Sequence, residues 1–145
     1  MLTLTSKYAL RAMIYLARHR ADWPIPGRRI AEQTEIPRKY LSKILGDLAR
    51  AGVLRSSPGR SGGFRLSRPA KETKLLTVLE PFEQFSHDQC PFDNEACGRE
   101  HPCRAHIKWA RILEARHRFL EGTSVEDVAD EAQRPKPPQA QRRKK

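Results

Sequence analysis

The feature that most constrains the fold is a glycine-rich turn between two short apolar stretches, placed directly after an amphipathic helix. Residues 56–63 read SSPGRSGG, a composition that permits a tight chain reversal. Val53 and Leu54 precede this turn, and residues 64–66 after it alternate apolar and polar side chains as a returning strand does. We therefore expect a β-hairpin whose tip is basic.

Three helical segments precede this hairpin. Apolar residues recur at helical spacing from residue 6 to about residue 20, with Thr5 or Ser6 placed to cap the segment. Prolines within residues 22–27 interrupt the chain, because they remove backbone donors and restrict their neighbours. A short second helix is expected over residues 28–34.

The third helix begins near Pro37 and ends at Gly52, where a left-handed cap residue is usual. Three helices followed by a hairpin are the element order of a winged helix-turn-helix, whose third helix enters the major groove of DNA. The predicted fold is therefore mainly α with a small β wing, extended by a long C-terminal helix. The apolar face of the third helix consists of Leu41, Ile44, Leu45 and Leu48.

The charge of the chain favours a polyanionic partner. The sequence contains 28 Lys and Arg against 17 Asp and Glu, for a net charge of +11. Neutralising the phosphates of a nucleic acid releases condensed counterions, which favours binding by basic proteins. Residues 133–145 combine prolines with basic side chains and carry no large apolar residue, so we expect a disordered basic tail.

Basic and polar residues on the third helix and on the hairpin are the candidate DNA contacts. Lysine and arginine can reach phosphates or guanine acceptors, and a serine hydroxyl can bond a base edge. Arg60 at the wing tip is placed to enter a narrow minor groove. The alternative is that these charges only solvate an exposed helix face. The candidates are Arg28, Arg38, Lys39, Tyr40, Ser42, Lys43 and Arg60.

The second half of the chain predicts further helices around a cysteine-containing segment. One helix is expected from residue 75 to about residue 85, and a long one opens at Pro102 and closes at Gly122. A capping box over residues 123–126 predicts a last helix that reaches about residue 132. The stripe of the long helix is either ordinary core or, as we favour, a homodimer seam. It consists of Trp109, Ile112, Leu113, Phe119 and Leu120.

Three cysteines and a histidine form a candidate metal site with the spacing C-x6-C-x5-C-x2-H. These residues are Cys90, Cys97, Cys103 and His106, and four such ligands satisfy a [2Fe-2S] cluster. Zinc accepts the same donors, although no close C-x2-C pair is present. Metal-free thiols that form a reversible disulfide are a further alternative.

Several function classes are excluded. The sequence has no apolar run long enough for a membrane span, no secretory leader and an odd cysteine count, so we expect a cytoplasmic protein without a disulfide framework. No phosphate-binding glycine loop, nucleophile elbow or zinc-protease motif is found, so we expect no enzyme. We divide the chain into a DNA-binding region (1–74), a cysteine loop with dimerisation helices (75–132) and the basic tail (133–145).

Four stretches resemble the IscR/NsrR family of bacterial winged-helix regulators, the Rrf2 type. They are LTLTSKYALRAMIYLA (2–17), IPRKYLSKIL (36–45), AGVL (51–54) and GRSGGFRLSRP (59–69), and the resemblance extends over about residues 2–130. It implies a homodimer that pairs through the long helix, binds a palindromic double-stranded DNA operator and often carries an iron-sulfur cluster. The sequence departs from the family pattern at Lys7 and Tyr8, near the place where some relatives supply an acidic ligand, at Pro58, and in a first cysteine interval that is one residue longer.

These observations predict a dimeric DNA-binding transcriptional regulator that senses iron-sulfur cluster, redox or nitrosative state through Cys90, Cys97, Cys103 and His106. Two alternatives stay open: a zinc-stabilised nucleic-acid-binding module without a sensing role, and a metal-free thiol-switch regulator. An iron-sulfur carrier or enzyme is more remote, because electron transfer does not require a basic recognition helix.

Overall fold

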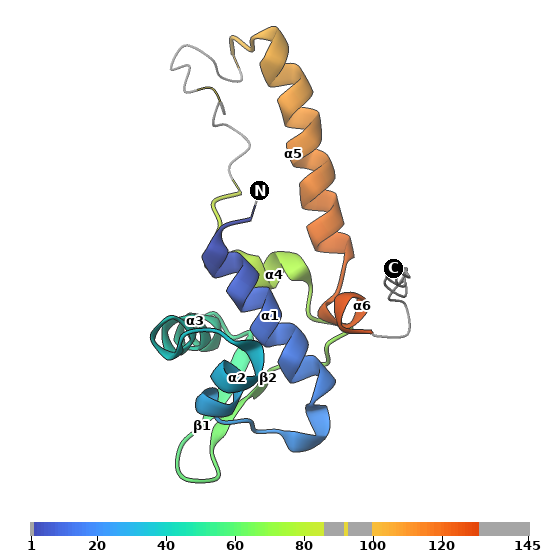
Figure 1. The fold of residues 1–145 in the computed structure, drawn as a ribbon. Helices are drawn as coiled ribbons and strands as arrows, with labels where there is room; N and C mark the ends of the chain where they lie inside the picture. Colours follow the sequence, from blue (N-terminus) through green and yellow to red (C-terminus); the bar gives the residue numbers. More distant parts are fainter. Residues whose placement is uncertain (1, 86–91, 93–99, 131–145) are drawn as a thin grey trace, which may run out of the picture.

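The computed structural model describes residues 2–85, 92 and 100–130 (Figure 1). Cys90, Cys97 and the predicted basic tail lie outside these residues. The described elements are α1 (Leu4–Arg18), the short 3-10 helix η1 (Arg20–Asp22), α2 (Gly27–Thr34), α3 (Arg38–Arg50), β1 (Leu54–Ser57), β2 (Gly63–Leu66), α4 (Leu75–Leu79), α5 (Arg104–Gly122) and α6 (Val125–Ala129).

Helix α1 begins earlier than the sequence predicted, and its cap is Thr3 rather than Thr5 or Ser6. The Thr3 hydroxyl accepts a hydrogen bond from the backbone N–H of Ser6 at 3.2 Å. Ser6 itself is fully buried within the first turn, and its hydroxyl donates to Glu83 at 2.5 Å. A side chain committed to that long-range contact cannot serve as the cap.

The helix-turn-helix follows the predicted pattern closely. The turn between α2 and α3 contains Glu35 in the left-handed region, with a φ of 55°. Helix α3 ends at Arg50, and Gly52 after its cap Ala51 takes the expected left-handed conformation with a φ of 76°. The N–H of Val53 bonds the carbonyl of Leu48 at 2.9 Å. The predicted apolar face of Leu41, Ile44, Leu45 and Leu48 is buried.

Strands β1 and β2 form the predicted antiparallel hairpin, with Leu54 opposite Leu66. The chain before α2 adds a contact that the sequence did not predict, because Ile25 pairs with Phe64 through hydrogen bonds of 2.8 and 3.0 Å. A Cβ on Gly63 would lie 2.3 Å from the carbonyl carbon of Ile25, so this close approach requires glycine. The hairpin and the three preceding helices complete a winged helix.

The end of α4 and the start of α5 differ from the sequence prediction. Helix α4 ends at Leu79 instead of near residue 85, because Pro81 cannot donate the next helical hydrogen bond. Helix α5 begins at Arg104, with Cys103 as its cap, rather than at Pro102.

The capping box of α6 is formed by Ser124 and Asp127, one residue later than predicted. Thr123 cannot take that role, because its backbone N–H closes α5 by donating to Phe119 at 3.0 Å. The described part of this last helix ends at Ala129.

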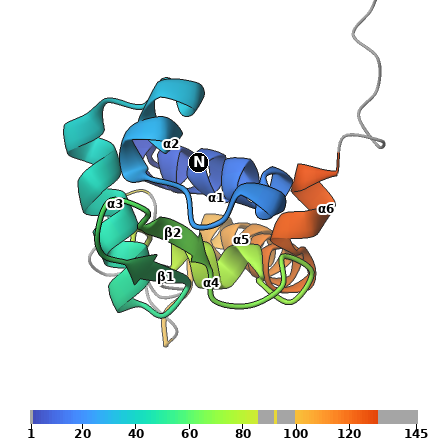
Figure 2. The same cartoon turned by 90° about the horizontal axis from the view of Figure 1, so that it is seen from below.

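Helix α1 lies at the centre of the core, with Ala9, Ala12, Met13 and Leu16 fully buried. The core also takes residues from α2, α3, both strands, α4 and the C-terminal end of α5. Helices α3 and α6 lie on opposite sides of α1, whereas most of α5 projects away from the winged helix (Figures 1 and 2). Among the described helices, none is both long and apolar enough to cross a membrane.

Candidate nucleic-acid interface and metal ligands

The outward face of α3 is basic and polar. Its buried leucine and isoleucine residues fix the helix against the core, so the remaining positions turn to solvent. Tyr40 exposes 64% of its surface, although it is a large aromatic residue. The lysines and the arginine of this face have no carboxylate within ion-pair distance in the described part of the chain. The exposed candidates here are Arg38, Lys39, Tyr40, Ser42 and Lys43.

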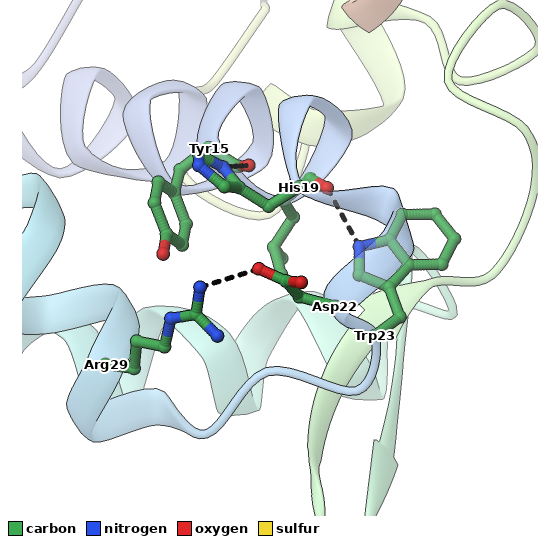
Figure 3. A network of polar contacts seen from close by, with 6 residues as sticks. Tyr15, His19, Asp22, Trp23 and Arg29 are labelled. Carbon is green, nitrogen blue, oxygen red and sulfur yellow. Dashed lines mark hydrogen bonds and ion pairs between the residues drawn. The ribbon is translucent and has the colours of Figure 1, made fainter.

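A group of contacts between α1, η1 and α2 fixes the position of the helix-turn-helix (Figure 3). Arg29 on α2 donates to Asp22 at 2.6 Å, and this bond, together with the nearby Tyr15, raises the pKa of the guanidinium above its ordinary value. The indole N–H of Trp23 donates to the carbonyl of Leu16 at 2.8 Å. These contacts hold α2 against the C-terminal end of α1. These contacts could not be predicted from the periodic pattern, because the two partners of each lie in different elements of the chain.

Arg28 differs from the other candidates, because it already has a partner. Its Nε donates to Glu32 one helical turn later, at 2.9 Å, and both side chains are largely exposed. An exposed pair of this kind contributes only about 0.3–0.5 kcal/mol, so Arg28 can exchange Glu32 for a phosphate at little cost. The i, i+4 spacing of the two residues was a signal that the sequence analysis did not use.

Arg60 lies at the exposed tip of the wing, between β1 and β2. Gly59 beside it has a φ of 93°, a conformation that suits glycine and lets the tip reverse tightly. The hairpin also exposes Arg55 and Arg65, which face each other across the two strands. Arg55 and Arg65 were not among the DNA contacts predicted from the sequence.

The structure brings two of the four candidate metal ligands together. Cys103 caps α5, and its Sγ accepts a hydrogen bond from the backbone N–H of His106 at 3.3 Å. His106 is 7% exposed and lies one helical turn beyond Cys103. The positive end of a helix dipole favours a negatively charged thiolate, so Cys103 is well placed as a metal ligand.

Within the described residues, no group of three or more metal-ligating side chains is found, and Cys90 and Cys97 lie outside them. Cys103 and His106 are a sulfur and a nitrogen donor on adjacent positions of one helical face, which suits half of a four-ligand site. The donor chemistry of these two residues therefore fits both an iron-sulfur cluster and zinc.

We define residues 86–103 as the cysteine segment. The residues just before it are held by contacts with two different helices. The carboxylate of Glu83 accepts hydrogen bonds from the backbone N–H of Thr3 at 2.8 Å and from the Ser6 hydroxyl. Two residues later, the guanidinium of Arg116 on α5 lies 5.1 Å from the ring centre of Phe85. The entrance to the cysteine segment thus contacts both α1 and α5.

Helix α5 exposes part of its apolar stripe. Leu113 and Leu120 are buried within the chain, but Ile112 and Phe119 are 58% and 59% exposed. These last two residues lie seven positions apart and therefore share one face of the helix. Trp109 is half-buried.

The family model described as "Rrf2: Iron-dependent Transcriptional regulator" matches residues 2–131 of this chain. An HTH-type transcriptional regulator of Aquifex aeolicus is 31% identical over 127 residues, which cover 86% of this chain and 88% of the relative. The HTH-type transcriptional regulator IscR of Aliivibrio salmonicida is 28% identical over 127 residues, which cover 88% of this chain and 76% of that protein.

Among solved structures, CymR, the global cysteine regulator of B. subtilis, is similar with a TM-score of 0.74 and 25% identity. The match covers 89% of this chain and 95% of that one. These matches confirm the winged-helix fold and the resemblance that the four sequence stretches indicated. They also agree with the expectation of a regulator rather than an enzyme.

Proposed function

Because the chain belongs to the Rrf2 family of transcriptional regulators, we propose that it binds a palindromic operator as a homodimer and that its cysteine site controls this binding. The observation that carries the proposal is the exposed face of α3, where three cations without carboxylate partners in the described residues flank Ser42. A regulator of this kind acts on the chromosome, so we propose a cytoplasmic location. The three-part division at residues 74 and 132 is retained as a functional proposal.

In the proposed complex α3 lies in the major groove. Lys39 and Lys43 contact phosphates or guanine acceptors, and Ser42 between them contacts a base edge. Arg38 and Tyr40 approach the backbone from the first turn of the helix, and Arg28 does so from α2. Arg60 reaches the flanking minor groove from the tip of the wing.

The exposed apolar residues of α5 support the homodimer. Ile112 and Phe119 present a hydrophobic face on a helix that projects away from the winged helix (Figure 1). Burying such a face against a second copy is favourable, and a two-fold dimer matches the symmetry of a palindromic operator.

For the cysteine site we propose an iron-sulfur cluster of the [2Fe-2S] type, held by Cys90, Cys97, Cys103 and His106. The position of Cys103 and His106 at the start of α5 supports this ligand set. A bound cluster would supply a redox-sensitive and nitric-oxide-sensitive centre. Zinc, or thiols without a metal, are the alternatives that the same donors allow.

The proposed coupling runs through the two ends of the cysteine segment. Its entrance contacts α1 at Ser6 and α5 at Arg116, and its exit is the cap of α5. Gain, loss or oxidation of the site would reorder the segment and shift α5 against α1. The two recognition helices of the dimer would then change their spacing. A bound cluster or ligand shifts the populations of the two arrangements only by its difference in affinity for them.

DNA selection from a random duplex pool, followed by gel shifts at several salt concentrations, tests the operator claim. Lys39→Ala with Lys43→Ala should weaken binding and lower the salt slope by about 4, because each protomer of the dimer loses two phosphate contacts. Ser42→Ala should instead change the preferred sequence. Arg20→Ala with Lys71→Ala removes two exposed cations that belong to neither α3 nor the hairpin and is the charge-matched control. Equal losses in the two double variants would refute the assignment of α3.

Anaerobic purification with an absorbance spectrum and iron, sulfide and zinc analysis tests the cluster claim. Cys103→Ala should abolish the visible chromophore, whereas His106→Cys should keep a cluster of lower potential, because the added thiolate disfavours the reduced state. His101→Ala is the control, since this histidine is exposed and lies in the same segment. Stoichiometric zinc without colour would favour the zinc alternative. Absence of all metal would favour the thiol switch.

A further inference from the structure

A basic groove lies between the end of α1, the strand β2 and the start of α6. Its volume is about 360 Å³. Its charged and aromatic residues come from three separate stretches of chain (residues 20–23, 65–71 and 126), so the fold brings them together rather than a local repeat. They are Arg20, Trp23, Arg65, Arg68, Lys71 and Glu126.

The charge of this groove is unbalanced. Four cations and a single carboxylate line it, and none of the four cationic side chains makes an ion pair or hydrogen bond with another described residue. Arg65 also lies directly opposite Arg55 in the hairpin, and like charges in that position are destabilising. An anion in the groove would relieve this repulsion.

One wall of the groove is held rigidly. The indole of Trp23 is anchored through its N–H to the carbonyl of Leu16 at 2.8 Å (Figure 3). The next residues of the same loop pair with β2 through Ile25 and Phe64. A groove with fixed walls loses little entropy when a ligand binds.

One end of the groove lies away from the recognition helix. The groove is bordered there by Glu126 of α6, and both views show α6 on the side of α1 opposite α3 (Figures 1 and 2). DNA held against the exposed face of α3 would therefore not reach the α6 end of the groove.

We propose that this groove binds a small phosphate-bearing molecule. Arginine presents a planar set of donors that matches phosphate oxygens in pairs, and two of the three arginines lie within four residues of each other on β2 and the turn after it. The volume lies within the range of small-ligand sites. The site does not depend on DNA binding, so each claim can fail without the other.

Titration of the full-length protein with inorganic pyrophosphate, at constant ionic strength kept with sodium chloride, tests the proposal. The chain contains two tryptophans, so a Trp109→Phe background leaves Trp23 as the sole tryptophan reporter in the groove. We expect a saturable change in Trp23 fluorescence. Arg65→Gln with Arg68→Gln should raise the midpoint at least about tenfold, because two charge-assisted bonds are lost.

Arg111→Gln with Arg118→Gln is the matched control, because it removes two exposed arginines of α5 that lie outside the groove. It should leave the midpoint within about twofold of the Trp109→Phe protein, and circular dichroism should show all variants folded. A linear, non-saturating response, or equal effects of the two double variants, would overturn the proposal. Loss of DNA affinity in Arg65→Gln with Arg68→Gln, without any pyrophosphate binding, would assign the groove to nucleic acid instead.

Discussion

Ser6 and Glu83 are 77 residues apart in the chain, yet the Ser6 hydroxyl donates to the Glu83 carboxylate at 2.5 Å. The same oxygen accepts the backbone N–H of Thr3, the cap of α1, at 2.8 Å. A carboxylate at this end of α1 is also favoured by the helix dipole. The contact therefore fastens the entrance of the cysteine segment to the helix that forms the centre of the core.

Glu83→Ala should destabilise the fold. The change removes the acceptor of the buried Ser6 hydroxyl and of the Thr3 N–H, and hydrogen bonds to a charged group contribute about 1.5–3 kcal/mol each. Because Glu83 is partly exposed and water can replace it at Thr3, we expect a total loss of about 1–2 kcal/mol. Urea unfolding followed by circular dichroism measures it. Glu80→Ala, an exposed glutamate three residues earlier, is the control and should change stability by less than about 0.5 kcal/mol.

The same contact predicts an acid dependence of stability. Partial burial by itself would raise the pKa of Glu83, but the hydrogen bonds from Ser6 and Thr3, with the charge of Arg116, hold it below its ordinary value. The folded chain therefore binds fewer protons than the unfolded chain. The stability that Glu83 contributes is fully present above its unfolded pKa of about 4.3. This stability is lost as the pH falls through the lower pKa of the folded state.

Urea midpoints at pH 7, 5, 4 and 3 measure this dependence. Glu83→Gln cannot titrate, so its stability should fall less steeply below pH 5 than that of the unmodified chain. Asp127 adds to the acid loss in both proteins, because hydrogen bonds from Ser124 lower its pKa as well. Parallel curves for the two proteins would show that Glu83 contributes nothing to the acid dependence.

The position of the α6 cap can be tested by paired substitutions. Ser124→Ala removes the hydroxyl that accepts the N–H of Asp127 and should cost about 1 kcal/mol. Thr123→Ala should cost less, because the contacts of Thr123 are made by its backbone. Thermal or urea unfolding of both variants gives the comparison. A larger loss of stability for Thr123→Ala than for Ser124→Ala would support the capping box over residues 123–126 that the sequence predicted.

The local elements of this fold could be predicted from the sequence, and the caps could not. The apolar spacing of α3 and its termination at Gly52 are encoded within one segment, so the pattern was sufficient. The caps of α1 and α6 were misplaced because distant contacts select them. Ser6 is drawn to Glu83, and Ser124 pairs with Lys74 across the core.

In the candidate sites too, local spacing could be predicted from the sequence and contacts between distant segments could not. The three-residue spacing of Cys103 and His106 placed both at the start of α5, and the structure has them there. Pairing of Ile25 with Phe64, the ion pair of Arg29 with Asp22, and the basic groove were not predicted. Each joins segments whose sequences carry no periodic signal of their proximity.

Gly63→Ala should damage the wing. The added Cβ would lie 2.3 Å from the backbone of Ile25, so the pairing of Ile25 with Phe64 must break, at a cost of about 2 kcal/mol or more. Gly46 in α3 offers a contrast, since a Cβ there meets only the side chain of Arg50 at 3.7 Å. Gly46→Ala should stabilise the helix by up to about 1 kcal/mol. Urea unfolding of the two variants should therefore give changes of opposite sign.

The exposed face of α5 predicts the state of assembly. Ile112→Ser with Phe119→Ser removes the two large apolar side chains of α5 that are more than half exposed, and we expect the dimer to dissociate. Light scattering coupled to size-exclusion chromatography should then change from twice the chain mass to 16.7 kDa. Without these two side chains, the apolar surface buried between the protomers no longer offsets the entropy lost on association.

Glu114→Ser with Glu121→Ser is the control for this prediction. These residues are also seven positions apart and exposed, but they lie on the opposite face of α5 from Ile112 and Phe119. The control should remain dimeric and keep its affinity for the selected operator, whereas the apolar double variant should lose affinity because its half-sites bind independently. If the unmodified chain were monomeric, or if both double variants dissociated alike, the exposed apolar face of α5 would not be the dimer interface.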